Sequence, residues 1–130
     1  MPATDPQEPF EIFNAAGAPL GIAPRGRVHR EGLWHRSTHV FLFDTAGRLL
    51  LQQRSASKDL YANAWDYSIG EHLQPGEDYL TAALRGLREE LAVTLTSLKP
   101  LGEPLPSEFV AADGGATDRE FQQAYRGVLD

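Results

Sequence analysis

The chain has no cysteine, and this absence removes several kinds of chemistry at once. Without a thiol there is no disulfide, no thiolate ligand for a metal ion and no cysteine nucleophile. Any catalytic or metal-binding site must therefore rely on oxygen and nitrogen groups. Such groups are plentiful, because the 130 residues include 18 Asp and Glu and 4 His.

Basic residues and long apolar runs are also scarce. The 12 Lys and Arg leave a formal net charge of −6, which opposes attraction to a nucleic-acid polymer or to an anionic membrane surface. No stretch approaches the ~20 apolar residues of a membrane span, and the N-terminal segment has neither a basic start nor an apolar core. These features predict a cytoplasmic protein that binds an anionic ligand through a metal ion or a local basic patch.

Length and composition predict one compact domain. A chain of 130 residues with 42% apolar residues can bury an adequate core. Residues 1–9 are rich in proline and polar groups, so we expect a flexible N-terminal tail there and the folded domain over residues 10–130.

The sequence predicts strands both before and after a single helix. Residues 10–14 and 20–30 predict two strands about a glycine turn, and residues 35–55 predict an apolar hairpin that turns at Gly47. Residues 64–70, 93–98 and 119–130 predict further strands. The combination indicates a mixed α/β (α+β) fold, of which an α/β/α sandwich is one form.

The predicted helix begins near Asp78, after a proline and a glycine. Its leucines recur at steps of four, three and four, so they lie on one face of the helix and are expected to be buried. This apolar stripe consists of Leu80, Leu84, Leu87 and Leu91.

Carboxylates gather around this helix. Glu89 falls opposite the leucine stripe, Glu90 lies about 100° further round, and Glu77 precedes the helix. Such a set can hold Mg²⁺ or Mn²⁺, because these cations prefer oxygen ligands and often complete their shell with a substrate's phosphates. The alternative is a solvated helix face, on which Arg85 and Glu89 form an i,i+4 pair of about 0.2–0.5 kcal/mol.

The segment from Glu71 to Val93 resembles the Nudix box, G-x5-E-x7-R-E-U-x-E-E-x-G-U, in which U is an aliphatic residue. It departs from the box at three positions: Glu71 replaces the first glycine, Gly86 the glutamate after the arginine, and Ala92 the later glycine. The positions that match are Glu77, Arg85, Leu87, Glu89, Glu90 and Val93. The resemblance implies a Nudix-type α/β/α sandwich with a mixed sheet.

Almost the whole chain is similar to the branch of the Nudix superfamily that includes the isopentenyl diphosphate isomerases. The segments GLWHRSTHVFLFD, GRLLLQQRSASKD, NAWDYSIGEH and DREFQQAYRGV carry this likeness. It implies that His35, His72 and Glu120 bind a metal ion, with Asp118 where another glutamate is expected. It also implies a pair of basic residues that contact a diphosphate.

Two glycines distinguish this chain from the isomerases of that branch and from many hydrolases of the wider superfamily. The catalytic cysteine of the isomerases would fall at Gly70, where a backbone hydrogen cannot exchange a proton with an alkene carbon. At Gly86 many Nudix hydrolases carry a glutamate that binds metal or acts as a general base, although the isomerases lack it. We therefore expect an isomerase-like hydrolase in which Glu120 is the base. If the missing acid limits the rate, Gly86→Glu should raise turnover.

The expected function is metal-dependent hydrolysis of a diphosphate bond in a nucleoside diphosphate derivative or a related small phosphoanhydride, with Mg²⁺ or Mn²⁺ as cofactor. Arg85 has an alternative role, which is to brace the helix carboxylates. By role, the expected residues are catalytic Glu89, Glu90 and Glu120; metal-binding Glu77, Glu89, Glu90, His35, His72 and Glu120; and substrate-binding Arg54, Lys58 and Arg85.

Two other functions stay open at this stage. A Nudix scaffold that has lost hydrolysis can serve as a binding module for a phosphate compound or a protein, and an isopentenyl diphosphate isomerase is the third alternative. Nudix relatives usually continue beyond a strand such as the one ending near Leu129 into another strand and a C-terminal helix that covers the sheet. Either the chain is an incomplete form, or a partner subunit, as in a homodimer, covers this apolar surface.

Overall fold

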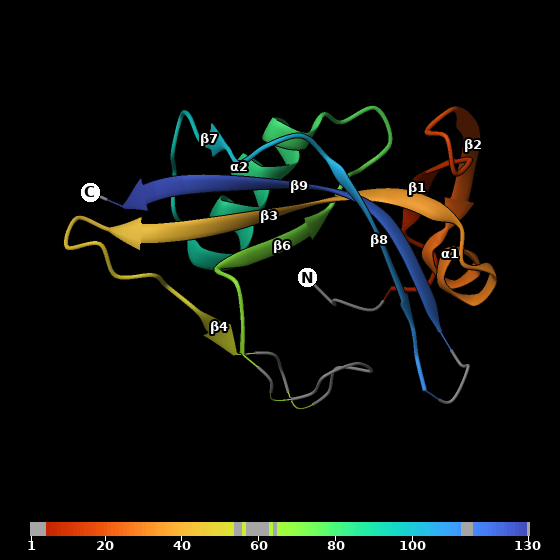
Figure 1. The fold of residues 1–130 in the computed structure, drawn as a ribbon, viewed down its shortest axis with the longest axis horizontal. Helices are drawn as coiled ribbons and strands as arrows, with labels where there is room; N and C mark the ends of the chain where they lie inside the picture. Colours follow the sequence, from red (N-terminus) through yellow and green to blue (C-terminus); the bar gives the residue numbers. More distant parts are fainter. Residues whose placement is uncertain (1–4, 54–55, 57–62, 64, 113–115, 130) are drawn as a thin grey trace.

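Strand β3 (Trp34–Asp44) is the centre of a mixed sheet (Figure 1). It runs parallel to β9 (Thr117–Leu129) along its whole length and antiparallel to the short strand β6 (Ile69–His72). Strand β1 (Pro9–Phe13) pairs with the beginning of β3. The computed structural model describes residues 5–53, 56, 63, 65–112 and 116–129.

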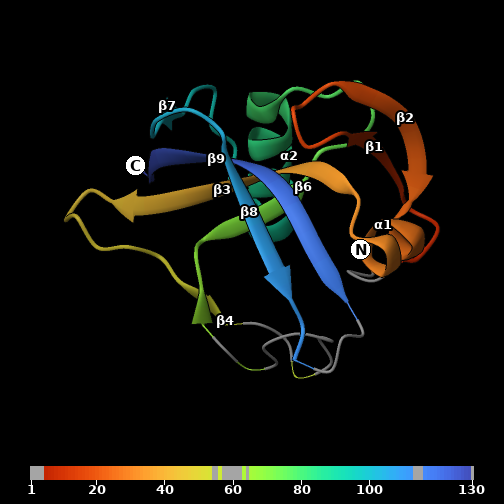
Figure 2. The same cartoon turned by 45° about the vertical axis from the view of Figure 1, so that its right-hand side comes forward.

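In the described part of the chain, two helices flank the sheet. Helix α2 (Tyr79–Leu91) packs against β3 and β6, whereas α1 (Arg25–Glu31) lies beside β1, β2 (Pro19–Pro24) and the beginning of β9 (Figures 1 and 2). The mixed α+β architecture predicted from the sequence is confirmed. The remaining elements are β4 (Gln52–Gln53), β5 (Trp65–Asp66), β7 (Lys99–Pro100) and β8 (Leu105–Val110).

Each helix closes its own apolar core. The core under α2 combines side chains from the helix with side chains from β3, β6 and β9. It consists of Val40, Leu42, Ile69, Ala83, Leu87 and Tyr125. The core under α1 is smaller and consists of Phe10, Ile12, Ala23 and Val28. None of the helices in the described part of the chain is long and apolar enough to cross a membrane.

Helix α2 has the expected start and a different buried face. Asp78 caps it, because its side chain accepts a hydrogen bond from the Thr81 N–H at 2.7 Å. The buried residues are Ala82, Ala83, Gly86 and Leu87. The prediction of a buried leucine stripe was wrong at Leu80, which is 38% exposed. The helix lies so close to β6 that small side chains, and not leucines, fill most of the contact.

Helix α1 corrects the prediction that residues 20–30 are extended throughout. Pro24 precedes the helix in an extended conformation, and Gly32 ends it in the left-handed region with φ 66°. Proline before a helix and glycine after it are ordinary signals for the two ends. The helix has seven residues, too few to show a clear apolar period. In the described part of the expected tail, Pro9 belongs to β1, and the main-chain oxygens of Pro6 and Glu8 accept hydrogen bonds from the first residues of α1.

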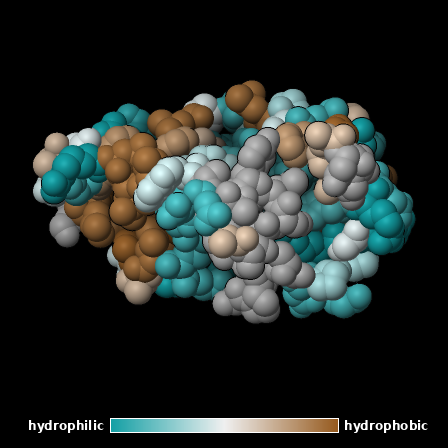
Figure 3. Space-filling view, turned by 90° about the horizontal axis from the view of Figure 1, so that it is seen from below, coloured by the Kyte–Doolittle hydropathy of each residue, from teal (hydrophilic) through white to brown (hydrophobic). Residues whose placement is uncertain are grey.

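The apolar hairpin predicted over residues 35–55 forms only in its first half. The turn at Gly47 is present, with φ 82°. In the described part of the returning chain, pairing with β3 ends at Leu50: Phe43 bridges to Leu49, and the Leu50 N–H donates to the Leu42 carbonyl oxygen at 2.9 Å. Farther along this edge β3 pairs with β6 instead, and its other edge pairs with β9. Leu49, Leu50 and Leu51 are consequently exposed, and apolar side chains gather at that end of the molecule (Figure 3).

Two further segments differ from the expectation. Residues 93–98 form no strand, and the chain enters the sheet only at β7. The sequence analysis also did not predict β8, which pairs antiparallel with the first half of β9. The strand predicted over residues 119–130 is confirmed as β9, apart from residue 130, which lies outside the described part of the chain.

Candidate metal centre

The alternation of side chains along β6 separates two groups of polar residues. In a strand, successive side chains point to opposite faces of the sheet. Ile69 contributes to the core under α2, so Glu71 points to the same side as α2. Gly70 and His72 point to the other side, where the His72 ring lies 4.7 Å from the Phe10 ring.

On the side of His72, three imidazoles and two carboxylates come together from four elements. His29 comes from α1, His35 from β3, His72 from β6, and Asp118 and Glu120 from β9. The His35 Nε2 atom lies 3.4 Å from Asp118 Oδ1 and 3.9 Å from Glu120 Oε1. The His72 Nε2 atom lies 3.6 Å from Glu120 Oε1, and His29 Nε2 lies 3.8 Å from Asp118 Oδ1. We call these five residues the histidine centre.

The protonation of His35 can be assigned from its surroundings. Its Nδ1 atom lies 3.0 Å from the Leu33 carbonyl oxygen, which can only accept a hydrogen bond. Nδ1 therefore carries the proton in the neutral ring, and the lone pair of Nε2 faces Asp118. His35 is 1% exposed, and both His35 Nε2 and Asp118 Oδ1 are buried without a hydrogen-bond partner among the described residues. Two acceptors that face each other in a buried place repel unless a positive group lies between them.

Burial shifts the pKa values of this centre toward the neutral forms. It lowers the pKa of His35 and lowers that of His72 well below the ordinary value, and nearby positive groups act in the same direction on His72. Burial, with a smaller contribution from the charge of Glu120, raises the pKa of Asp118 to about 6. Burial also raises the pKa of Glu120. At neutral pH His35 and His72 thus keep their lone pairs free for coordination.

These residues fit a divalent metal ion. Two overlapping groups, His29–His35–His72 and His35–Asp118–Glu120, each bring their ligand atoms within 4.8 Å of one another. A cation would satisfy the two unpartnered buried atoms and neutralise the carboxylates. Carboxylate oxygen suits Mn²⁺ and imidazole nitrogen suits Zn²⁺ and Fe²⁺, so this mixed donor set fits a first-row transition ion such as Mn²⁺ better than Mg²⁺.

On the side of α2, Arg85 ties the preceding loop to the helix. Its Nε and NH2 atoms donate to the two carboxylate oxygens of Glu77, each at 2.9 Å, and NH2 also donates to the His72 carbonyl oxygen at 3.0 Å. The main-chain N–H of Gln74 donates to Glu77 as well. The Arg85 side chain is only 11% exposed. The geometry thus gives Arg85 the bracing role that was the alternative to substrate binding, and engages both oxygens of Glu77.

Gly86 lies at the closest approach of α2 to β6. A Cβ atom at this position would stand 2.9 Å from Ile69 Cγ2 and 3.3 Å from Glu71 Cβ. Contacts under 3.0 Å do not occur for real Cβ atoms, so any side chain here would displace its neighbours. The glycine therefore permits the packing of helix on strand. A glutamate at position 86 would therefore displace Ile69 and Glu71. The expectation that Gly86→Glu raises turnover did not include this loss of packing.

The predicted metal-binding residues consequently fall into two sets. His35, His72 and Glu120 meet in the histidine centre, whereas Glu77, Glu89 and Glu90 belong to the loop and helix on the other side of β6. Glu89 and Glu90 are exposed at the end of α2. Among the described residues, no three carboxylates around α2 bring oxygens within 4.8 Å of one another. Arg54 and Lys58 lie outside the described residues.

The surroundings of Gly70 leave little room for a side chain. A Cβ atom there would lie 3.1 Å from Tyr67 Cε2. The Tyr67 ring stacks on His39 with the ring centroids 4.1 Å apart, and its hydroxyl lies 3.0 Å from His39 Nε2. Tyr67 thus occupies the space beside the position at which the isomerases carry their cysteine.

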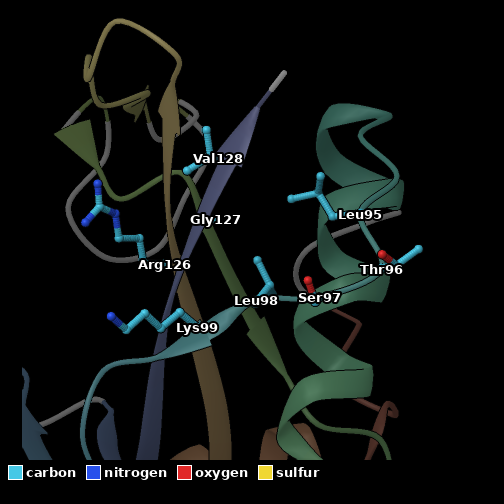
Figure 4. Close-up of a pocket in the computed structure, with 8 residues that line it drawn as sticks. All are labelled: Leu95, Thr96, Ser97, Leu98, Lys99, Arg126, Gly127 and Val128. Carbon is cyan, nitrogen blue, oxygen red and sulfur yellow. The ribbon is translucent and has the colours of Figure 1, made fainter.

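A surface hollow of about 570 Å³ lies away from both groups. It is lined by the segment that follows α2 and by the end of β9, with Leu95 and Leu98 on one side and Val128 on the other (Figure 4). No residue of the histidine centre and no carboxylate of α2 lines it. The chemistry predicted for this protein therefore does not depend on this hollow.

The sequence comparison decides the family. A family model described as the NUDIX domain matches residues 33–129, which is most of the chain. The chain belongs to the Nudix family. The resemblance to the Nudix family is thereby confirmed, and the curated relatives confirm the likeness to the isomerases.

Curated Nudix relatives include both hydrolases and isomerases. The chain is 39% identical over 124 residues to Nudix hydrolase 3 from Arabidopsis thaliana, a match that covers 92% of this chain and 16% of that protein. It is also 39% identical over 122 residues to the isopentenyl-diphosphate Delta-isomerase of Serratia proteamaculans, which covers 92% of this chain and 65% of the isomerase. The chain thus spans less than two thirds of the length of either relative.

A solved structure has the same architecture. The crystal structure of DR0079 from Deinococcus radiodurans superposes with a TM-score of 0.63 at 28% sequence identity, over 92% of this chain and 72% of that one. This likeness confirms the Nudix-type fold with its large mixed sheet.

His29 is the residue of the centre that the sequence analysis missed, and Asp118 was noted there without being assigned as a ligand. His29 lies in the segment that was predicted to be extended, where its side chain had no defined direction. The signal that could have found it is the combination of Pro24 and Gly32, which bounds a short helix. On that helix His29 faces the rings of His35 and His72, with ring centroids 5.6 and 6.2 Å away.

Proposed function

We propose that this Nudix protein hydrolyses a diphosphate bond in a nucleoside diphosphate derivative or a related small phosphoanhydride, with Mg²⁺ or Mn²⁺ as cofactor. The observation that supports this most strongly is the pair of unpartnered acceptors, His35 Nε2 and Asp118 Oδ1, in a buried set of three imidazoles and two carboxylates. Nudix proteins generally use divalent metal ions. The three imidazoles and Asp118 would hold the ion, which when bound supplies positive charge to phosphate oxygens and makes water more acidic.

Glu120 is the proposed general base. Its Oε2 atom accepts hydrogen bonds from Ser37 Oγ at 3.2 Å and from Gln122 Nε2 at 3.3 Å. These two donors orient the carboxylate, so that Oε1 is the oxygen that faces His35 and His72 and takes up the proton. The raised pKa of Glu120 brings its proton affinity closer to that of a base that works near neutral pH.

Glu89 and Glu90 are proposed to act with the substrate. They are exposed, so a cation that arrives with a diphosphate can reach them, and one or two carboxylates suffice when phosphate oxygens fill the other positions. Arg85 and Glu77 position this end of the helix relative to the loop and to the His72 carbonyl. The basic residues Arg54 and Lys58 stay predicted contacts of the diphosphate.

The packing around Gly70 favours hydrolysis over isomerisation. Gly70 has no side chain that could donate a proton to an alkene carbon, and Tyr67 fills the adjacent space. The isomerase names among the relatives therefore do not by themselves transfer to this chain. The cytoplasmic location and the homodimer expected from the sequence stay predictions.

The test is a panel of nucleotide and isoprenoid diphosphates with Mg²⁺ or Mn²⁺, read by phosphate release and mass spectrometry. We expect hydrolysis of at least one compound, its loss with a chelator, and a loss of 100-fold or more in His35→Gln. His39→Gln is the matched control, because His39 lies on the same strand outside the histidine centre. Nucleotide binding without turnover would instead select the binding module, and conversion of isopentenyl diphosphate to its isomer would select the isomerase.

A further inference from the structure

We propose that Glu71, from strand β6, takes the place of the helix glutamate that is missing at Gly86 and joins Glu89 in holding a divalent cation with the substrate's diphosphate. This inference rests on the proposed function and assigns a role to a residue at which the chain departs from the Nudix box.

Positions 71 and 86 share one space. A Cβ atom at position 86 would lie 3.3 Å from Glu71 Cβ and 3.6 Å from Glu71 Cγ. The stem of Glu71 therefore passes over the place where a side chain at position 86 would start. A glutamate at either position leaves little room for one at the other, so the glycine in the helix accommodates the glutamate in the strand.

The Glu71 carboxylate lies beside the Arg85 guanidinium. Its Oε2 atom is 3.6 Å from Arg85 NH1, and the same NH1 atom is 3.4 Å from Glu89 Oε2. Glu71 and Glu89 thus approach one guanidinium nitrogen from different elements. In a helix, a glutamate at position 86 would be the i,i+3 neighbour of Glu89. Glu71 places a carboxylate beside the same partner from the strand.

Arg85 binds Glu77 more closely than Glu71. Glu77 accepts two hydrogen bonds of 2.9 Å from Arg85, whereas Glu71 lies 3.6 Å away as an ion pair without a hydrogen bond. Glu71 is 10% exposed at its side chain, and it shares the one positive charge of Arg85 with Glu77 and Glu89. Three carboxylates around one guanidinium leave a local excess of negative charge, which a divalent cation that binds with a diphosphate would offset.

The test measures Mn²⁺ binding by electron paramagnetic resonance, with and without imidodiphosphate, a diphosphate analogue that resists hydrolysis. In the wild-type protein we expect Mn²⁺ that binds alone, at the histidine centre, and further Mn²⁺ that binds only with imidodiphosphate. Glu71→Gln keeps the stem and removes the charge. It should weaken the imidodiphosphate-dependent binding at least tenfold and leave the other binding within twofold. Glu108→Gln, a charge removal on β8, is the matched control and should change neither.

A double-mutant cycle separates a shared cation from a structural ion pair. If Glu71 and Glu89 hold the same ion, the losses in Mn²⁺ affinity from Glu71→Gln and Glu89→Gln should not add, and the double variant should be less than tenfold weaker than either single variant. If Glu71 only pairs with Arg85, Glu71→Gln should shift the unfolding midpoint and leave Mn²⁺ affinity unchanged.

The outcomes also separate this proposal from the proposed hydrolysis. A wild-type protein that binds Mn²⁺ with imidodiphosphate through Glu71, and yet hydrolyses no diphosphate, would refute the hydrolytic function and support the role of Glu71. Unchanged binding in Glu71→Gln would overturn the role of Glu71 while hydrolysis could persist. Absence of any imidodiphosphate-dependent Mn²⁺ in the wild-type protein would overturn it as well.

Discussion

Replacement of Gly86 by alanine tests the close packing of α2 on β6. In an open helix this change stabilises a protein by about 1 kcal/mol, because alanine restricts the unfolded chain and favours the helix. Here the new methyl group would lie 2.9 Å from Ile69 Cγ2 and 3.3 Å from Glu71 Cβ. Overpacking of this kind costs about 1–3 kcal/mol. Because two neighbours must move, we place the cost near the upper end and expect a net destabilisation of about 1–2 kcal/mol.

Urea unfolding followed by circular dichroism would measure this change. The matched control is Ile69→Ala, which removes the Cγ2 atom that the new methyl group meets. In the Ile69→Ala background, Gly86→Ala should cost less by about 1–2 kcal/mol, or should stabilise the protein, because the clash is gone. A gain of stability from Gly86→Ala in the wild-type background would refute the reasoning, since it would mean that position 86 is open.

Three further predictions concern stability. Burial lowers the pKa of His39 to about 4, below the value of about 6.5 in the unfolded chain, so the unfolded state binds more protons between these values. The His39 contribution to stability is therefore intact above about pH 6.5 and falls by up to about 3 kcal/mol as the pH drops to about 4. The free energy of unfolding of His39→Gln should lack this part of the pH dependence, and the same pH dependence in the variant and the wild-type protein would contradict the expectation. Ala92 ends α2 with φ 55°, a conformation that favours glycine, so Ala92→Gly should raise the free energy of unfolding by about 0.5–1 kcal/mol in urea titrations, and a loss would count against this reading of the helix end. Arg85→Gln leaves the Glu77 carboxylate without its partner and should lower the free energy of unfolding by about 3 kcal/mol, whereas a change below about 0.5 kcal/mol would contradict the bracing role.

The parts of the fold that were predictable have strong local signals. Helix α2 combines the Asp78 cap with a regular apolar period, and β9 is a long alternating strand. Segments with weak or ambiguous signals were not predictable. The leucines after Gly47 suggest a buried strand, but the edge of β3 to which they return is paired with β6 over Ser37–Val40, and the other edge is paired with β9. Local propensity cannot report such competition.

The candidate site was predictable only through its likeness to a family. His35, His72 and Glu120 are far apart in sequence, and neither their spacing nor the composition indicates that they meet. The resemblance placed them, and the register of β3 with β6 and β9 explains their proximity, since Ser37 lies opposite His72 and His35 opposite Glu120. His29 could not be placed without α1. The closeness of Glu71 to Gly86 also depends on how α2 packs, which no pattern in the helix alone reveals.

The central claim is that the histidine centre holds a divalent ion on which catalysis depends. The most direct measurement is the amount of Mn²⁺ bound per chain after equilibrium dialysis at pH 7.5 and at pH 5, in the wild-type protein and in His35→Gln. The account predicts one tightly held ion at pH 7.5, weaker binding at pH 5 because Asp118 with its pKa of about 6 becomes protonated, and loss of the ion in His35→Gln with an unchanged circular dichroism spectrum. A wild-type protein that holds no ion at saturating Mn²⁺, or a His35→Gln variant that holds it as tightly, would contradict the account.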